Sequence, residues 1–192
     1  MPKFSSKERK RIYEILLEKG KEMFNEKGFY EVTAEAVALE AGIAKGTFYH
    51  FFENKEHLYM VINNRIQEEV FESIRKILSN LENEGQVDRF FHALCHVAGQ
   101  FMDNPLMMEI DARVWQRIEE KAPQDCVEEN SIRDLKLLET IENSGIQFRY
   151  DLHQTMRILQ LQFLQLPYIK EVKEIENMNI ILRALSEHLI IE

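Results

Sequence analysis

The chain has 192 residues, carries 24 Lys and Arg against 33 Asp and Glu, and is 45% hydrophobic. This length allows one compact domain or a small module fused to a larger one, and the hydrophobic share excludes a globally disordered chain. No run of about 18 apolar residues is present, which excludes a membrane-spanning helix. The basic N-terminus leads into no continuous apolar stretch, and Cys95 and Cys126 lie in no paired metal spacing. We therefore expect no secretory signal, a cytoplasmic location and two free thiols.

The charge is distributed unevenly along the chain. The net charge of the chain is −9. Residues 1–55 have a net charge of +1, whereas residues 56–192 have a net charge of −10. The segment from Lys3 to Arg11 contains five basic residues and one acidic residue. This distribution permits a nucleic-acid contact in the N-terminal quarter and disfavours one elsewhere. The alternative is that the basic arm is only solvated.

The residue pattern predicts an all-α fold of about nine helices, because only 7 Gly and 4 Pro are present and apolar residues recur at helical spacings. Thr33, Asn54 and Asp151 are expected to cap helix N-termini, and Gly28 and Gly145 to end helices. The predicted helices cover about residues 6–27, 33–41, 44–51, 55–78, 87–102, 105–120, 125–143, 151–166 and 170–191.

The pattern between Val37 and Phe48 is typical of a helix-turn-helix. Ala38 is the small residue that lets two helices press together, Gly42 supplies the turn, and Ile43 and Phe48 are placed to fix the crossing angle. Small and polar side chains suit a helix that enters a DNA major groove. A generic pair of short helices in an all-α core is the alternative. The outward positions of the second helix are Ala44, Lys45, Gly46, Thr47, Tyr49 and His50.

The same region closely resembles the DNA-binding domain of TetR-family transcriptional regulators. The resemblance rests on Gly-Phe-Tyr at 28–30, Val-Thr-Ala-Glu at 32–35 and Ala-Gly-Ile-Ala-Lys-Gly-Thr-Phe-Tyr-His-Phe-Phe-Glu-Asn-Lys-Glu-His-Leu at 41–58. At motif level it covers about residues 8–65. It implies a DNA-binding domain at 1–54, with its motif at about 32–51. Residues 55–192 would then form a larger helical domain for effector binding and dimerisation.

The resemblance also assigns roles to single residues. It implies that Thr33 and Lys55 contact phosphate, that Tyr49 and His50 contact backbone or bases, and that the helix starting near Ala44 reads DNA. Many family members carry serine where this chain has Ala44, so one hydroxyl contact is absent. Lys45 is then the expected base reader, with guanine as its natural partner. The alternative is that Tyr49 partly packs in the domain and that His50 is an ordinary solvated surface residue. The predicted DNA-binding residues are Thr33, Ala44, Lys45, Gly46, Thr47, Tyr49, His50 and Lys55.

By the same resemblance, the last two helices pair with a second subunit in a four-helix bundle. Two apolar stripes at helical spacing fit that role, although they could serve only the core of one subunit. The first stripe is Met156, Leu159, Phe163 and Leu166, and the second is Ile175, Met178, Ile181, Leu182, Leu185 and Leu189. A homodimer would read a palindromic operator in double-stranded DNA.

The central helices are the expected place of a small-molecule effector, because pockets are mainly apolar with a few polar groups. Ordinary core packing is the alternative for each residue. The His92-x-x-Cys95-His96 pattern lacks a third metal ligand, so we predict neither a metal nor another cofactor. The predicted effector contacts are Phe91, His92, His96, Met102, Met108, Trp115, Phe148 and His153.

These features predict a non-enzymatic, ligand-responsive repressor that acts as a homodimer. A DNA-binding organising protein without an effector is the first alternative. An all-α enzyme or ligand carrier is the second, but the sequence offers it no catalytic constellation.

Overall fold

The computed structural model describes residues 4–108, 111–163, 166 and 172–191. Over these residues the chain forms nine α-helices and one 3-10 helix, so the predicted all-α fold is confirmed. The β-type pairing found among them is an isolated antiparallel bridge between Phe148 and Ile190. The chain divides into two compact units, Met1–Ile66 with Glu109–Asn130, and Gln67–Met108 with Ser131–Glu192. None of the described helices is long and apolar enough to cross a membrane.

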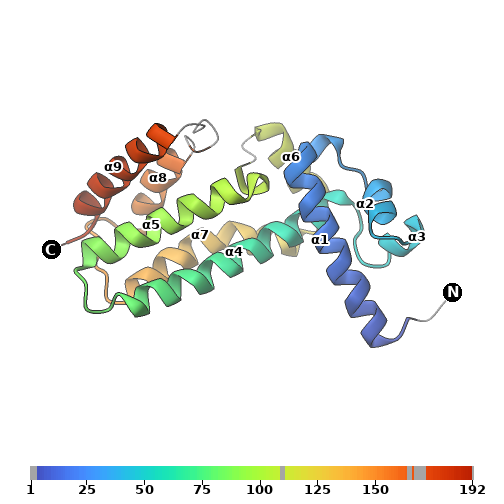
Figure 1. Cartoon of the computed structure of the whole chain (residues 1–192), viewed down its shortest axis with the longest axis horizontal. Helices are drawn as coiled ribbons and strands as arrows, with labels where there is room; N and C mark the ends of the chain where they lie inside the picture. Colours follow the sequence, from blue (N-terminus) through green and yellow to red (C-terminus); the bar gives the residue numbers. More distant parts are fainter. Residues whose placement is uncertain (1–3, 109–110, 164–165, 167–171, 192) are drawn as a thin grey trace. The chain divides into compact units, whose positions relative to one another are not determined.

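The first unit contains α1 (Ser6–Glu31), α2 (Ala34–Glu40), α3 (Lys45–Phe48), α6 (Ala112–Lys121) and the starts of α4 (Lys55–Asn80) and α7 (Gln124–Asn143) (Figure 1). Helix α1 begins with a capping box in which Ser5 and Glu8 each accept a hydrogen bond from the other's backbone N–H. Gly28 has a φ of 75°, as a helix end requires, but helical turns resume as far as Glu31. The prediction of a helix ending before Gly28 was therefore short by one kinked turn.

Aromatic rings form much of the core of this unit. The ring of Tyr59 meets the rings of Phe24 and Phe29 edge-on, with centroids 5.1 and 5.3 Å apart. Phe48 and Phe52 are also fully buried. Edge-to-face pairs of this kind stabilise a core beyond the area that they bury. They join α1, the region after α3 and the start of α4 into one small domain.

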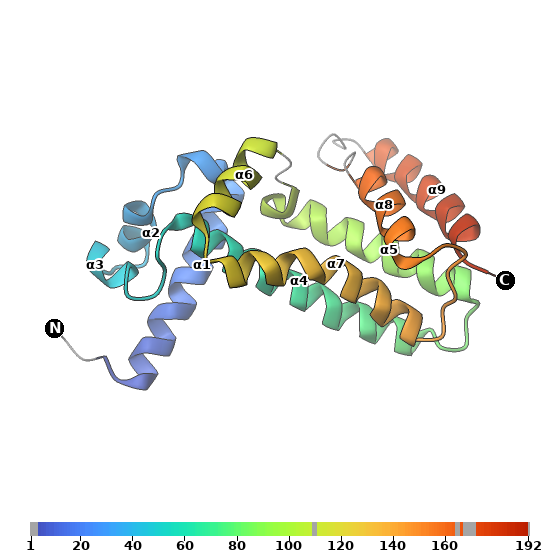
Figure 2. The same ribbon diagram turned by 180° about the vertical axis from the view of Figure 1, so that it is seen from behind.

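The second unit contains the remainder of α4 and α7 together with α5 (Gln86–Asp103), a 3-10 helix η1 (Pro105–Met108), α8 (Leu152–Phe163) and α9 (Val172–Leu189). Helix α9 packs against α5, and α8 lies beside α9 in both views (Figures 1 and 2). As predicted, Gly145 ends the preceding helix, and the side chain of Asp151 accepts a hydrogen bond from the backbone of Gln154 at 2.9 Å.

Two further helix predictions were wrong in length. The helix expected over 105–120 is divided into η1 and α6, because Asp111 is extended and caps a new helix with its own carboxylate. The helix expected over 44–51 ends at Phe48, and the turns after it close with hydrogen bonds from His50 to Thr47 and from Phe51 to Phe48. The segments predicted to end α8 at 166 and to begin α9 at 170 lie partly outside the described residues.

Candidate nucleic-acid interface

Helices α2 and α3 are held together by a tight turn and a small buried contact. Gly42 has a φ of 67°, a conformation that costs other residues energy. The backbone N–H groups of Gly42 and Ile43 donate to the carbonyls of Leu39 and Ala38, both at 3.0 Å. Phe48 is fully buried. The turn and the buried ring therefore fix the direction in which the outer face of α3 points.

That outer face carries the polar residues that the sequence singled out. Ala44, Lys45, Gly46, Tyr49 and His50 are exposed, and Thr47 is half-buried. On the neighbouring helix, Thr33 is exposed and caps α2, since its hydroxyl accepts a hydrogen bond from the N–H of Ala36 at 3.1 Å. The structure thus brings the predicted DNA-binding residues of α2 and α3 to the surface of one unit.

Lys45 does not project alone from this surface. Its ammonium is paired with the carboxylate of Glu35 in the first turn of α2 and lies 6.0 Å from the centre of the Tyr49 ring. The hydrogen bond to Glu35 raises the pKa of Lys45 and lowers that of Glu35. Both side chains are about half exposed. No spacing in the sequence indicates this pair, which joins residues ten positions apart across the turn.

Lys55 occupies a different setting from the one predicted. Its ammonium donates hydrogen bonds to the carbonyls of Phe29 at 2.7 Å, Val32 at 2.8 Å and Tyr30 at 3.3 Å. It also lies 4.5 Å from the centre of the Phe29 ring, and its partial burial lowers its pKa. All three N–H groups are therefore used within the fold, at the point where the chain passes from α1 to α2.

A basic cavity of about 400 Å³ opens beside this surface, between the start of α1 and the residues after α3. The guanidinium of Arg9 lies 5.3 Å from the centre of the Phe51 ring, and the ring of Tyr13 stacks on that of Phe52 at 5.4 Å. Of the described residues that line it, none is acidic. The basic N-terminal segment was the sequence signal for it. The cavity is lined by Ser6, Arg9, Lys10, Tyr13 and Phe51.

The predicted effector contacts are spread over both units. Trp115 belongs to the first unit, where its ring meets that of Tyr59 at 6.4 Å. The side chain of Met108 lies outside what the structure describes. The remaining six, Phe91, His92, His96, Met102, Phe148 and His153, belong to the second unit.

Within the second unit these six residues differ in exposure, and the rings of Phe91 and His92 lie 5.6 Å apart. His92 and His153 are exposed, and Phe91 and Met102 are half-buried. His96 is 2.6 Å from the hydroxyl of Ser73, and partial burial lowers its pKa. Phe148 packs edge-on against Phe90 at 5.3 Å. Among the residues that the structure describes, no group of three His, Cys, Asp or Glu is placed to hold a metal ion.

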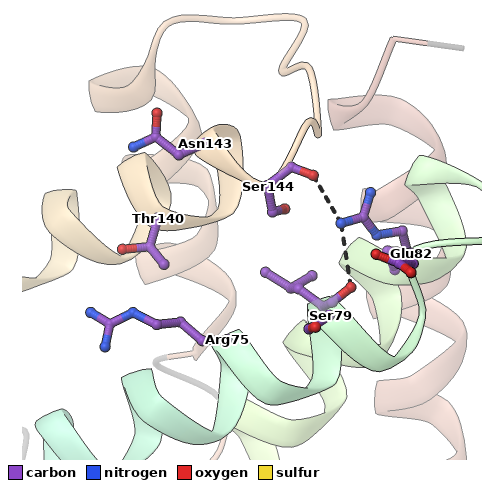
Figure 3. A pocket seen from close by; sticks show the side chains of 8 residues that line it. Arg75, Ser79, Glu82, Thr140, Asn143 and Ser144 are labelled. Carbon is purple, nitrogen blue, oxygen red and sulfur yellow. Dashed lines mark hydrogen bonds between the residues drawn. The ribbon is translucent and has the colours of Figure 1, made fainter.

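A cavity of about 590 Å³ lies instead at the ends of α4 and α7 (Figure 3). Arg89 is buried there and donates to the carbonyls of Ser144 at 2.9 Å and Leu78 at 3.4 Å. These carbonyls belong to helix C-termini, which carry partial negative charge, so they compensate the guanidinium. The lining residues, none of which was predicted as an effector contact, are Arg75, Leu78, Ser79, Glu82, Arg89, Thr140, Asn143 and Ser144.

Part of the first unit matches a family of known proteins. Residues 16–61 match the sequence model of the bacterial regulatory proteins of the tetR family. This range contains α2, the turn, α3 and the start of α4. Over residues 16–61 the chain is therefore similar to TetR-family proteins, and members of that family are transcriptional regulators and not enzymes.

Solved structures extend the similarity of fold to the whole chain. A TetR-family transcription regulator from Marinobacter aquaeolei VT8 is 14% identical with a TM-score of 0.62, over 98% of this chain and 100% of that one. The ketosteroid transcriptional regulator KstR2 of Mycobacterium tuberculosis is 17% identical with a TM-score of 0.60, over 99% and 98%. Thermus thermophilus FadR, a TetR-family repressor in complex with lauroyl-CoA, is 20% identical with a TM-score of 0.54, over 94% and 96%. No curated protein matches the sequence. The chain has the fold of a TetR-family transcription regulator.

Proposed function

We propose that this chain is a ligand-responsive repressor that binds a palindromic operator in double-stranded DNA as a homodimer. The observation that carries the proposal is the exposed, small and polar face of α3, held by the turn at Gly42 within a TetR-family domain. Small residues at Ala44 and Gly46 let the helix approach the groove floor, and Lys45 and Thr47 are long or polar enough to reach base edges and phosphates. DNA binding is assigned to residues 1–54, and effector binding and dimerisation to 55–192.

The DNA-facing surface in this proposal is wider than α3. Thr33, Tyr49 and His50 flank the recognition helix, and the basic cavity at Arg9 and Lys10 extends the surface towards the start of α1. Because Arg9 and Lys10 are cationic and no carboxylate among the described residues lines the cavity with them, this cavity is suited to binding a DNA phosphate. Lys55 is assigned to the fold, because its N–H groups already have carbonyl partners.

A small molecule bound by residues 55–192 would release the operator by favouring a second geometry of the dimer. Such release requires only that the ligand binds one geometry more tightly than the other. Thermus thermophilus FadR was solved in complex with lauroyl-CoA, and this acyl-CoA is a reasonable first probe. The eight predicted effector contacts stay predictions.

One observation favours the alternative of a DNA-binding organising protein without an effector. The predicted effector contacts are divided between the two units, and in the cavity of Figure 3 the side chains of Arg89, Thr140 and Ser144 already donate hydrogen bonds within the fold. The two functions differ in a simple assay. Operator-bound protein is challenged with lauroyl-CoA and then with a broad metabolite library. Release by any compound at a saturable site supports the repressor, and retention against all of them supports the organising protein.

The role of Lys45 tests the DNA-binding proposal at one side chain. Replacing Lys45 by Ala should cost about 1–3 kcal/mol of specific binding and relax discrimination at one base position. The comparison is between base preferences of the wild type and the variant, each selected from a random duplex pool. Lys76→Ala, which removes an exposed lysine from α4 in the second unit, is the charge-matched control. If the base preference of Lys45→Ala were the same as that of the wild type, Lys45 would not recognise a base.

A further inference from the structure

The ion pair between Glu35 and Lys45 places an acidic side chain on the surface that we assign to DNA. Glu35 lies in the first turn of α2, two residues after the cap Thr33, and Lys45 is the first residue of α3. Their side chains are 52% and 57% exposed, so both are accessible to a ligand in solution. In the free protein Lys45 is therefore already paired with an anion.

The fold does not depend on this pair. Helices α2 and α3 are joined by the buried residues Val37, Ala38 and Phe48 and by the hydrogen bonds of the turn. An ion pair between two exposed side chains adds little stability to such a core. Removing the carboxylate of Glu35 should therefore leave the domain folded. The function of the pair is then not to stabilise the fold.

A carboxylate in this position opposes contact with DNA in a selective way. A DNA phosphate offers Lys45 one negative charge, and Glu35 already supplies one. The pair with Glu35 forms within the protein, so it does not require DNA to lose bound water. A guanine edge in the operator offers two acceptors to Lys45, and it comes with the full set of surrounding contacts. The pair should therefore persist on random DNA and open on the operator.

We propose that Glu35 is a specificity-determining residue that holds Lys45 away from DNA phosphates and so weakens binding to non-operator DNA. The inference rests on the proposed function in one respect, that the face of α3 meets DNA. It adds an intramolecular competitor for the residue that reads the base. The carboxylate of Glu35 would repel phosphates as well as occupy the ammonium of Lys45.

The test is the salt dependence of binding to a random-sequence duplex. In Glu35→Gln, Lys45 becomes free to contact a phosphate, so the slope of log affinity against log salt should steepen by about 0.9. Affinity for random duplex should rise by up to about fivefold at moderate salt. Glu40→Gln, which removes an exposed carboxylate from the same helix, is the matched control and should leave the slope unchanged. In Glu35→Gln combined with Lys45→Ala, the extra slope should disappear.

Three results would overturn the inference. The first is a slope in Glu35→Gln equal to that of the wild type. The second is an equal steepening in Glu40→Gln, which would reduce the effect to net charge. The third is a loss of operator affinity in Glu35→Gln with random binding unchanged, which would make Glu35 a base reader itself. Measurement on random duplex needs no known operator, so a failure of this inference is separate from a failure to select a palindrome.

Discussion

Lys55 shows how one side chain can be matched to a family motif and still have another function. It stands where the family places a phosphate-contacting lysine, but its ammonium meets three carbonyls at the junction of α1 and α2. These carbonyls lie at the C-terminal end of α1 and at its cap Val32, where helix carbonyls have no intrahelical partners. Lys55 satisfies them with a positive charge, which also suits a helix C-terminus. It is therefore a positioning residue for the helix-turn-helix.

Replacing Lys55 by Met separates the two roles. The variant keeps the length of the side chain and loses the hydrogen bonds, so the free energy of unfolding should fall by about 1–3 kcal/mol. Chemical denaturation measures this change, and Lys27→Met, at an exposed lysine of α1, is the control. The salt slope of operator binding should stay within experimental error. A slope lower by about 0.9 with unchanged stability would restore Lys55 as a phosphate contact.

At the scale of elements, α6 is tied to the start of α4 by two polar contacts. The guanidinium of Arg117 donates to the carboxylate of Glu56 at 2.6 Å, and the amide of Asn54 donates to the carbonyl of Lys121 at 2.8 Å. The side chain of Glu56 is only 3% exposed. A buried carboxylate that loses its cation is costly. These two contacts hold α6, which is distant in sequence, against the start of α4 within the first unit.

We expect Arg117→Ala to lower the free energy of unfolding by at least about 2 kcal/mol, because Glu56 would be left buried without its partner. Arg113→Ala is the matched control on the same helix. Arg113 is 82% exposed and pairs with Asp111 at the surface, so its removal should cost less than about 1 kcal/mol. If the two substitutions lowered the free energy of unfolding equally in urea denaturation, the contact of Arg117 with Glu56 would stabilise the fold no more than a surface ion pair does.

At the scale of the whole molecule, the surface of α8 and α9 is the candidate dimer interface. The residues of the predicted apolar stripes differ in exposure. Ile175 and Ile181 are exposed, Met156, Phe163 and Leu185 are half-buried, and the others, Leu159, Leu166, Met178, Leu182 and Leu189, are buried. Leu161 and Ile180, which the stripes did not include, are 54% and 68% exposed. A set of exposed apolar side chains on two neighbouring helices is what a bundle interface needs.

Substituting Ile180 by Glu should convert the proposed homodimer into a monomer, because the charge would be buried at the interface. Analytical ultracentrifugation reports the change directly. Ile132→Glu introduces the same charge at an exposed isoleucine of α7, 48% accessible, and should leave the dimer intact. A wild-type protein that is monomeric at high concentration would contradict the proposed assembly.

The sequence predicted the part of the molecule in which local rules decide the structure. Gly42, the caps at Thr33 and Asp151 and the buried Phe48 all follow from backbone preferences and short-range spacing. The break at Asp111 was missed because Pro105 and the apolar pattern after it are equally consistent with one helix or two. The partners of Lys45 and Lys55 depend on where distant residues meet in space. No spacing rule along the chain reports such contacts.

The most direct test of the account is to select bound duplexes from a random-sequence DNA pool and to follow the affinity of the winner against salt. We predict a palindromic consensus, with one half-site for each recognition helix, and a steep fall of affinity with salt from several phosphate contacts. No enrichment by a folded dimer that has been unfolded and refolded to strip bound ligand would contradict the central claim that this surface reads DNA.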